Sequence, residues 1–164
     1  MQIKYINKTP TVDEFNQLTE AVGWGRRENA VVEEALRYTL YSVCAYDEDK
    51  LIGYGRIIGD KTIFLHIHDV MVRPEYQSMG IGTGIMNKIL DKVNEYRRVN
   101  LSIRVYLGAS KGKEGFYEKF GFVSRPNEIL GAGMVWNSNS WNIRAMIWKE
   151  YINSQSFFII LKKL

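Results

Sequence analysis

A segment with two glycines, Gln77 to Gly82 (QSMGIG), separates an apolar strand-like run from a long amphipathic helix. The run before it, Ile63 to Val72, must end at Arg73-Pro74 because proline cannot continue a central ladder. After it, apolar residues recur every four positions from Ile81 to Val93, as on the buried face of a helix. Leu101 to Leu107 is typical of another strand, so we expect a parallel crossover here.

The part of the chain before this crossover predicts a short edge strand and two helices. Gln2 to Asn7 alternates weakly between apolar and polar residues. Thr11 and Glu14 have the spacing of a capping box, so the first helix is expected to have Thr11 as its N-cap. A second helix is expected over Val31 to Leu40, where apolar residues recur with helical spacing.

Two further strands, at Tyr41 to Tyr46 and Leu51 to Ile58, are expected to form a hairpin that continues into the strand before the glycine segment. The result is an antiparallel meander joined to the parallel crossover. Downstream, a short helix is expected over Lys113 to Phe120, closed by Gly121, and a last strand over Gly133 to Trp136.

Composition restricts the class of protein. The 164 residues, 46% of them hydrophobic, suffice for one domain with a sizeable core. The net charge of +4 is scattered and too small to indicate nucleic-acid binding. Cys44 is the only cysteine, which excludes an internal disulfide, indicates a reducing compartment and suits a small buried residue. Without a signal-peptide pattern or a membrane-spanning apolar stretch, we expect a cytoplasmic protein with no membrane contact.

The composition changes from Asn137, where Asn-Ser-Asn-Ser is typical of a linker. We therefore expect one domain over residues 1–137 and an appendage over residues 138–164. Three interpretations of the appendage are open: docking onto its own domain, a dimer contact, or a sequence artefact.

The glycine segment suits an anionic ligand. Its glycines let the backbone come close to a pyrophosphate and point amide hydrogens at it. It is not a Walker loop, since no Gly-Lys-Ser/Thr follows, and not a dinucleotide fingerprint, since Ile85 stands where that pattern needs glycine. A purely structural turn at the start of the helix is the alternative interpretation.

Two motifs carry a resemblance to a known family. Val70 to Gly82 (VMVRPEYQSMGIG) resembles the acetyl-CoA signature of the GNAT superfamily, a strand followed by Arg/Gln-x-x-Gly-x-Gly/Ala. Phe116 to Phe122 (FYEKFGF) resembles the aromatic-Tyr-Glu-Lys-x-Gly-Phe segment of the same family. The motifs follow each other in the family's order, and the resemblance covers residues 1 to about 137.

This resemblance implies an α/β fold with a mixed, mostly antiparallel central sheet, flanked by helices and splayed between strands four and five. The pantetheine of acetyl-CoA, the implied co-substrate, would insert there because splayed strands leave backbone amides and carbonyls unpaired. The implied contact positions are Val70, Met71, Val72, Gln77, Ser78, Met79, Gly80, Ile81, Gly82, Thr83 and Ser110. Ser110 stands where the family often has asparagine.

The resemblance also implies a general acid. Tyr117 matches the tyrosine that protonates the departing CoA thiolate, a transfer that ordinary thiol and tyrosine pKa values permit. A core aromatic beside Phe116 and Phe120 is the alternative.

A base is expected near the strand that ends at Val72, because the attacking amine must lose a proton. His66 and His68 share one face of that strand and resemble the pair of aralkylamine N-acetyltransferases, with His68 expected nearer the amine. The alternatives are histidines that only fill the cleft, or a metal pair; no metal is expected, because a third ligand would have to be a carboxylate. Asp69 should point to the opposite face if the strand is regular.

Substrate selection in the family usually falls to the first two helices and their loop, here Gly23 to Glu28. We predict that Trp24 and Tyr54 contact the acceptor, which suits an aryl amine or a polyamine, although each could instead be a core aromatic. Arg26 and Arg27 point instead to a carboxylate or phosphate on the substrate.

Together these features predict an acyltransferase that moves acetyl from acetyl-CoA to a primary amine of a small molecule, by direct attack in a ternary complex. Acetylation of a protein N-terminus or lysine, and a non-catalytic CoA-binding module, are the alternatives. A homodimer is one option that the resemblance leaves for the assembly.

Overall fold

The computed structural model describes residues 2–135, which belong to two compact units, one up to Ser110 and one from Lys111 onward. The predicted boundary at residue 137 and the appendage over 138–164 lie outside the described residues. The first unit holds a five-stranded sheet in the order β1-β2-β3-β4-β5. Its strands are β1 (Ile3–Ile6), β2 (Tyr41–Asp47), β3 (Lys50–Gly59), β4 (Phe64–Val72) and β5 (Arg104–Leu107).

The sheet is mixed, as predicted. The first four strands pair antiparallel with their neighbours, and β4 pairs parallel with β5. The β5 ladder covers only Phe64 to Ile67 of β4, whereas β3 pairs along β4 as far as Val72. Within the described residues, β4 from His68 to Val72 has no strand partner on its β5 side. This is the expected splay between the fourth and fifth strands.

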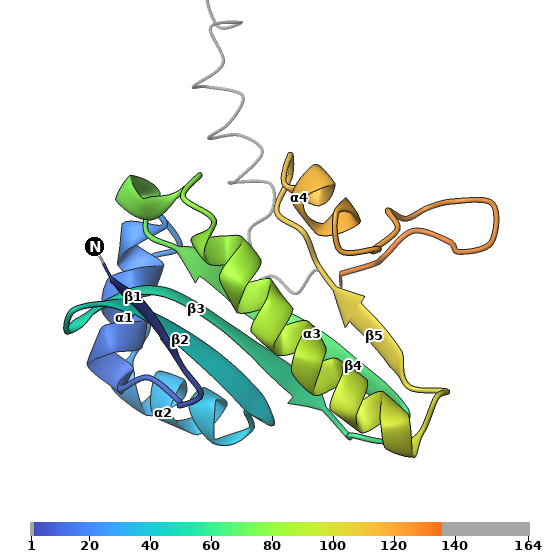
Figure 1. The fold of residues 1–164 in the computed structure, drawn as a ribbon, viewed down its shortest axis with the longest axis horizontal. Coiled ribbons are helices and arrows are strands. Elements are labelled where there is room, and N and C mark those ends of the chain that lie inside the picture. The colour runs from blue at the N-terminus through green and yellow to red at the C-terminus, as the bar shows by residue number, and fades with distance from the viewer. Residues whose placement is uncertain (1, 136–164) are drawn as a thin grey trace, which may run out of the picture. The chain divides into compact units, whose positions relative to one another are not determined.

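Helices cover both faces of this sheet (Figure 1). α3 (Ile81–Val99) crosses one face, while α1 (Val12–Ala21) and α2 (Asn29–Arg37) cover the other. The predicted capping box is present: the Thr11 hydroxyl accepts the Glu14 amide at 3.2 Å, and the Glu14 carboxylate accepts the Thr11 amide at 2.7 Å. In the described part of the chain, no helix combines the length and the apolar character needed to cross a membrane.

Two glycines in β3 let α3 lie close to the sheet. A Cβ built at Gly55 would lie 2.8 Å from Ile85 and 2.9 Å from Ile89, and one at Gly53 would lie 2.8 Å from Ile85. Carbon atoms pack at about 3.5–4.0 Å, so any side chain here would push the helix away. The predicted apolar stripe of α3 is buried against this surface: Ile81, Ile85, Met86, Ile89 and Val93.

The opposite face of the sheet has its own core. Phe15 and Leu18 of α1 pack with Val32 and Leu36 of α2 over the strands. Cys44 belongs to the same cluster, and burial raises the pKa of its thiol to about 12, as suits a small buried residue.

The described part of the second unit contains one short helix, α4 (Glu114–Glu118). Gly121 follows with φ +86°, in the left-handed conformation that favours glycine at a helix end, as predicted. Residues 133–135 of the predicted last strand form neither helix nor strand, so that prediction is wrong for them, and Trp136 lies outside the described residues. A strand needs a partner, and the local pattern could not show one.

Candidate active site

The turn between β4 and α3 is anchored to the β2–β3 hairpin. Arg73 donates from Nε to the Leu51 carbonyl at 2.8 Å, which holds the end of β4 against β3. A single 3-10 turn, Pro74–Tyr76, follows, and the Tyr76 hydroxyl donates to Asp47 at 3.1 Å. These contacts fix where the glycine segment begins.

Gly80 forms the entrance to α3. It is the N-cap residue, with φ +80° and no side-chain cap, and Ser78 before it also has a positive φ of 63°. A Cβ built at Gly80 would meet no atom within 4 Å, so this side of the turn is open. The amides of Ile81, Gly82 and Thr83 have no acceptor inside the helix, and the helix dipole favours an anion there. The turn therefore suits a phosphate group.

Several predicted contact positions could offer a ligand only their backbone, because their side chains are buried or already bonded. Met71 and Ile81 are buried in the core, 3% and 2% exposed, so only their main-chain groups can face a ligand. Gln77 donates from Nε2 to the Val72 carbonyl at 3.0 Å, which ties the turn to the strand end. Four other positions stay predicted contacts: Val70, Val72, Met79 and Ser110. Ser110 is the last residue of the first unit.

Asp69 points to the other face of β4 than predicted, because β4 has a bulge at this position. The register shifts between Tyr54 and Arg56 of β3, so that Gly55 alone faces Asp69 and Val70. Asp69 has φ +52°, a left-handed conformation. The extra residue turns its side chain to the face of His68, so the regular alternation that we assumed was wrong.

Asp69 binds two side chains on this face. Its carboxylate accepts from Arg56 Nε at 2.7 Å and lies 2.8 Å from Nδ1 of His68. Burial raises the pKa of Asp69, but the hydrogen bond from His68 and the charge of Arg56 outweigh burial and hold that pKa below its usual value. An ionised carboxylate only accepts, so Nδ1 of His68 carries the hydrogen and a neutral His68 ring keeps a lone pair on Nε2.

His66 and His68 lie on one face of β4, as predicted, with their ring centroids 5.6 Å apart. Their surroundings differ. The His68 side chain is 48% exposed, whereas Nδ1 of His66 is buried without a hydrogen-bond partner in the described part of the chain. Burial, followed by the charge of His68, lowers the pKa of His66. His68 is therefore the more accessible of the two rings.

An open hollow of about 650 Å³ lies between the end of α2 and the β3–β4 hairpin, and neither histidine lines it. Ile58, the cross-strand neighbour of His66, lines it, and so does Arg56, the neighbour of His68. The aromatic rings of Tyr38 and Phe64 also line it and are 68% and 43% exposed. The hollow thus offers aromatic surface next to three charged side chains, those of Arg37, Arg56 and Asp60.

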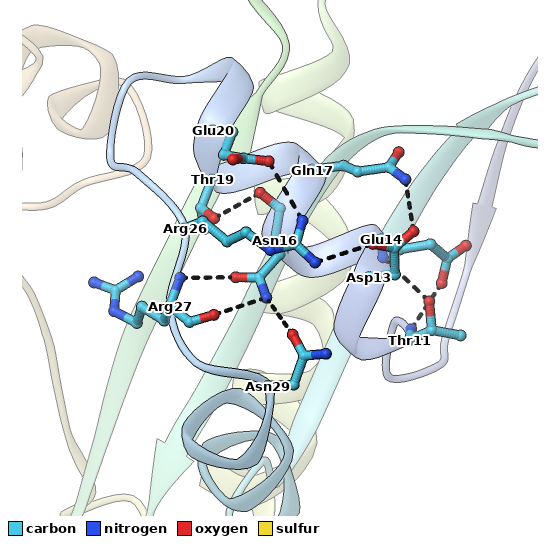
Figure 2. A network of polar contacts seen from close by, with 10 residues as sticks. All are labelled: Thr11, Asp13, Glu14, Asn16, Gln17, Thr19, Glu20, Arg26, Arg27 and Asn29. Carbon is cyan, nitrogen blue, oxygen red and sulfur yellow. Dashed lines mark hydrogen bonds and ion pairs between the residues drawn. The ribbon is translucent and has the colours of Figure 1, made fainter.

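The loop between α1 and α2 is held by a polar network (Figure 2). Asn16 is fully buried and binds the Arg27 backbone twice: its Nδ2 donates to the carbonyl at 3.0 Å, and its Oδ1 accepts the amide at 3.1 Å. Arg26 lies 3.4 Å from the Asp13 carboxylate, so its charge has a partner within the protein. Trp24 is 45% exposed and stays a predicted acceptor contact.

Tyr54 lies in the core. It is fully buried and packs edge-on against Phe15 at 5.9 Å, and burial raises its pKa to about 12. A ring without exposed surface cannot wall a substrate pocket, so the core interpretation replaces the predicted acceptor contact.

Tyr117 belongs to α4 of the second unit. Its ring packs edge-on against Phe116 at 5.0 Å and Phe122 at 6.4 Å. Burial raises its pKa, so the phenol stays protonated at neutral pH and can donate a hydrogen bond or a proton. The predicted role as general acid stays a prediction.

The sequence held no indication of Arg56, and its alternation placed Asp69 on the opposite face of the strand from His68. Asp69 follows His68 directly, but its direction depends on a bulge, and Arg56 reaches it only through strand pairing. The available signal was that aspartate tolerates left-handed backbone better than most residues. Among residues 2–135, no three His, Cys, Asp or Glu side chains are grouped to hold a metal ion.

The splayed sheet and the open turn at α3 define an acyltransferase fold, and comparison with known proteins agrees. Residues 17–138 match the family model described as Acetyltransferase (GNAT) domain. The chain belongs to the GNAT acetyltransferase family.

Relatives and solved structures give the same family. An uncharacterized N-acetyltransferase, ycf52-like, of Prochlorococcus marinus is 33% identical over 123 residues, which cover 73% of this chain and 66% of that protein. A probable acetyltransferase from methicillin-resistant Staphylococcus aureus has a TM-score of 0.72 and 31% identity, over 84% of this chain and 100% of that chain. A GNAT family protein from Streptococcus pneumoniae has a TM-score of 0.70 and 28% identity, over 84% and 99%.

Two relatives carry names with different acceptors. A histone acetyltransferase of Glycine max is 28% identical over 139 residues, which cover 78% of this chain and 58% of that protein. A chloroplastic serotonin N-acetyltransferase of Oryza sativa is 27% identical over 124 residues, which cover 73% and 60%.

Proposed function

We propose that this chain transfers acetyl from acetyl-CoA to a primary amine of a small molecule, by direct attack of the amine in a ternary complex. The observation that carries the proposal is the place of His68 and its partner Asp69. His68 is the first residue of β4 beyond the β5 ladder. A base with an accessible nitrogen therefore stands where the unpaired strand edge begins.

The residues present suit CoA. Those backbone amides and carbonyls of β4 between His68 and Val72 that point away from β3 can bind the amide groups of pantetheine, much as a neighbouring strand would. The first amides of α3 can bind the diphosphate, and Gly80 leaves room for its approach. Acetyl-CoA supplies a thioester carbonyl that a neutral amine can attack.

Two proton transfers accompany the proposed reaction. Nε2 of His68 takes the proton that the amine loses as the new amide bond forms. Tyr117 gives a proton to the sulfur as the carbon–sulfur bond breaks, so that CoA leaves as a thiol. No covalent acetyl-enzyme is needed, and the high pKa of Cys44 makes that thiol unsuited to the role.

The acceptor we propose is an amine that carries an aromatic ring. Tyr38 and Phe64 give the hollow between α2 and the β3–β4 hairpin an aromatic lining that would stack with such a ring. The name of the rice relative supports the same class. The name of the soybean relative points to a protein acceptor, which the same assay can detect.

A thiol-release assay with an amine panel tests this function. The panel holds arylalkylamines, alkyl diamines and polyamines, and peptides with a free lysine or N-terminus. We expect arylalkylamines to have the highest kcat/KM, and His68→Gln to lower that value about 100-fold while the matched His66→Gln variant changes it much less. Turnover confined to peptides would overturn the proposed acceptor, and equal loss in both variants would remove His68 as the base.

A further inference from the structure

Arg56 links the candidate base to α2. Its guanidinium is nearly buried, with the side chain 10% exposed, and it makes three contacts. Nε donates to Asp69 at 2.7 Å, and Nη1 donates to the Ala35 carbonyl at 2.7 Å and to the Thr39 hydroxyl at 3.3 Å. One side chain of β3 thus ties the bulge of β4 to the end of α2.

We propose that Arg56 is a positioning residue for the transfer reaction: it holds the Asp69 carboxylate so that His68 keeps its hydrogen on Nδ1 and presents Nε2 to the amine. The catalytic part of this inference rests on the proposed function. Arg56 acts only through Asp69, since the structure records no contact between Arg56 and the His68 ring.

The geometry gives Arg56 this task for two reasons. Asp69 has a left-handed backbone, which residues other than glycine adopt at a cost and keep only where their surroundings hold them. Arginine keeps its charge at all working pH values, and its planar fork fixes direction as well as distance. Without it, the carboxylate would be free to rotate away from Nδ1, and the His68 ring would lose its orientation.

The hollow offers a matched control. Arg37 lines the same hollow but pairs with Glu33 at 3.1 Å and Glu34 at 3.2 Å, and its side chain is 65% exposed. Arg56→Met and Arg37→Met therefore remove the same charge and keep similar length. Only the first removes a contact to Asp69.

The first experiment needs no activity. Long-range ¹H–¹⁵N spectra of the imidazoles report the tautomer of each ring, and because the chain has two histidines, the His66→Gln variant assigns both. At a pH where His68 is neutral, we expect the Nδ1–H form in the unmodified protein and in Arg37→Met, and a tautomer mixture in Arg56→Met. An unchanged Nδ1–H form in a folded Arg56→Met protein would overturn the proposal, even if no acceptor amine were found.

The second experiment measures kcat, KM and acetyl-CoA affinity. Misorientation of a base by about 1 Å can cost about 100-fold, so we expect a loss of that order in kcat for Arg56→Met, with acetyl-CoA affinity unchanged. Arg56→Lys, which keeps the charge without the fork, should recover part of kcat and serves as the folded variant if Arg56→Met does not fold. Asp69→Asn and the double variant complete a cycle in which the two losses should not add. Additive losses, or full activity of Arg56→Met, would contradict positioning through Asp69.

Discussion

Tyr117 places a hydroxyl group in a cluster of otherwise apolar aromatic rings. Its neighbours Phe116 and Phe122 are apolar, so its hydroxyl is the polar group of this aromatic cluster. Burial raises its pKa, which keeps the proton available for a leaving thiolate.

Tyr117→Phe removes that hydroxyl and keeps the ring. We expect kcat to fall about 100-fold, in the range of general acid catalysis, while the Kd for acetyl-CoA changes less than about twofold. Tyr96→Phe, at a half-buried position near the end of α3, is the control and should keep kcat. Steady-state kinetics with calorimetric Kd values check this, and an unchanged kcat would remove Tyr117 from the mechanism.

His66 makes stability depend on pH. Its pKa in the folded protein lies below the ordinary value of 6.5, so the unfolded chain binds more protons near that pH. The free energy of unfolding should therefore be highest above pH 6.5 and fall as the pH drops from there through the folded-state pKa. Urea unfolding at about pH 7 and about pH 5.5 should show this loss, and His66→Gln should reduce it. An equal loss in both proteins would place the acid sensitivity elsewhere.

The sequence predicted the faces of β4 that His66 and His68 occupy, but not the face that Asp69 occupies. A strand period of two correctly put His66 and His68 on one face, because alternation is local. The same rule failed one residue later, since a bulge depends on how β3 pairs with β4. Tyr54 failed in a related way: an aromatic in an alternating strand is equally suited to a pocket wall and to a core, and tertiary packing decided for the core.

Among the helices and strands, the close packing of α3 on β3 requires glycine in the strand and isoleucine in the helix. Gly53 and Gly55 face the helix, and the isoleucines of α3 occupy the space that side chains would need. This close approach also fixes where the first turn of α3 lies relative to β4.

Gly55→Ala should push Ile85 and Ile89 out of this space. Overpacking of this kind costs about 1–3 kcal/mol of unfolding free energy. Gly108→Ala is the control, because a Cβ there meets no atom within 4 Å. Chemical denaturation of both variants checks the difference, and equal stability would mean that α3 can shift without cost.

Gly80→Ala tests the turn that precedes α3. Both Gly80 and Gly23 have left-handed φ values, +80° and +81°, with open space around a built Cβ. Alanine at either site should cost about 1–2 kcal/mol of backbone strain. Only Gly80→Ala should also weaken acetyl-CoA binding, about tenfold, because its methyl group points into the open side of the turn. Calorimetric titration separates the two, and equal affinities would contradict the phosphate site.

The sequence predicted elements best where the signal was local. The capping box at Thr11 and the stripe of α3 depend on residues three and four apart, and both are present. The predicted boundaries of α2 were wrong by two to three residues, since the helix lies over Asn29–Arg37 instead of Val31 to Leu40. Glycines 53 and 55 gave no signal of close packing, because their partners lie about 30 residues away in α3.

In the first unit as a whole, the splay between β4 and β5 places an edge of β4, the start of α3 and His68 in one region. Within residues 2–135 it leaves one edge of β4 without a strand partner, and His68 stands at the start of that edge. Composition and periodicity predicted a mixed sheet, but the splay came only from the resemblance to a family, because strand separation leaves no mark in a single strand's pattern.

Hydrogen–deuterium exchange with and without acetyl-CoA tests most directly the claim that this edge and this turn hold the co-substrate. We expect slower exchange in peptides that cover residues 68–72 and 78–83, with little change in β1 and β2. Unchanged exchange in these two segments at saturating acetyl-CoA would contradict this co-substrate site, whether or not exchange slows in other segments.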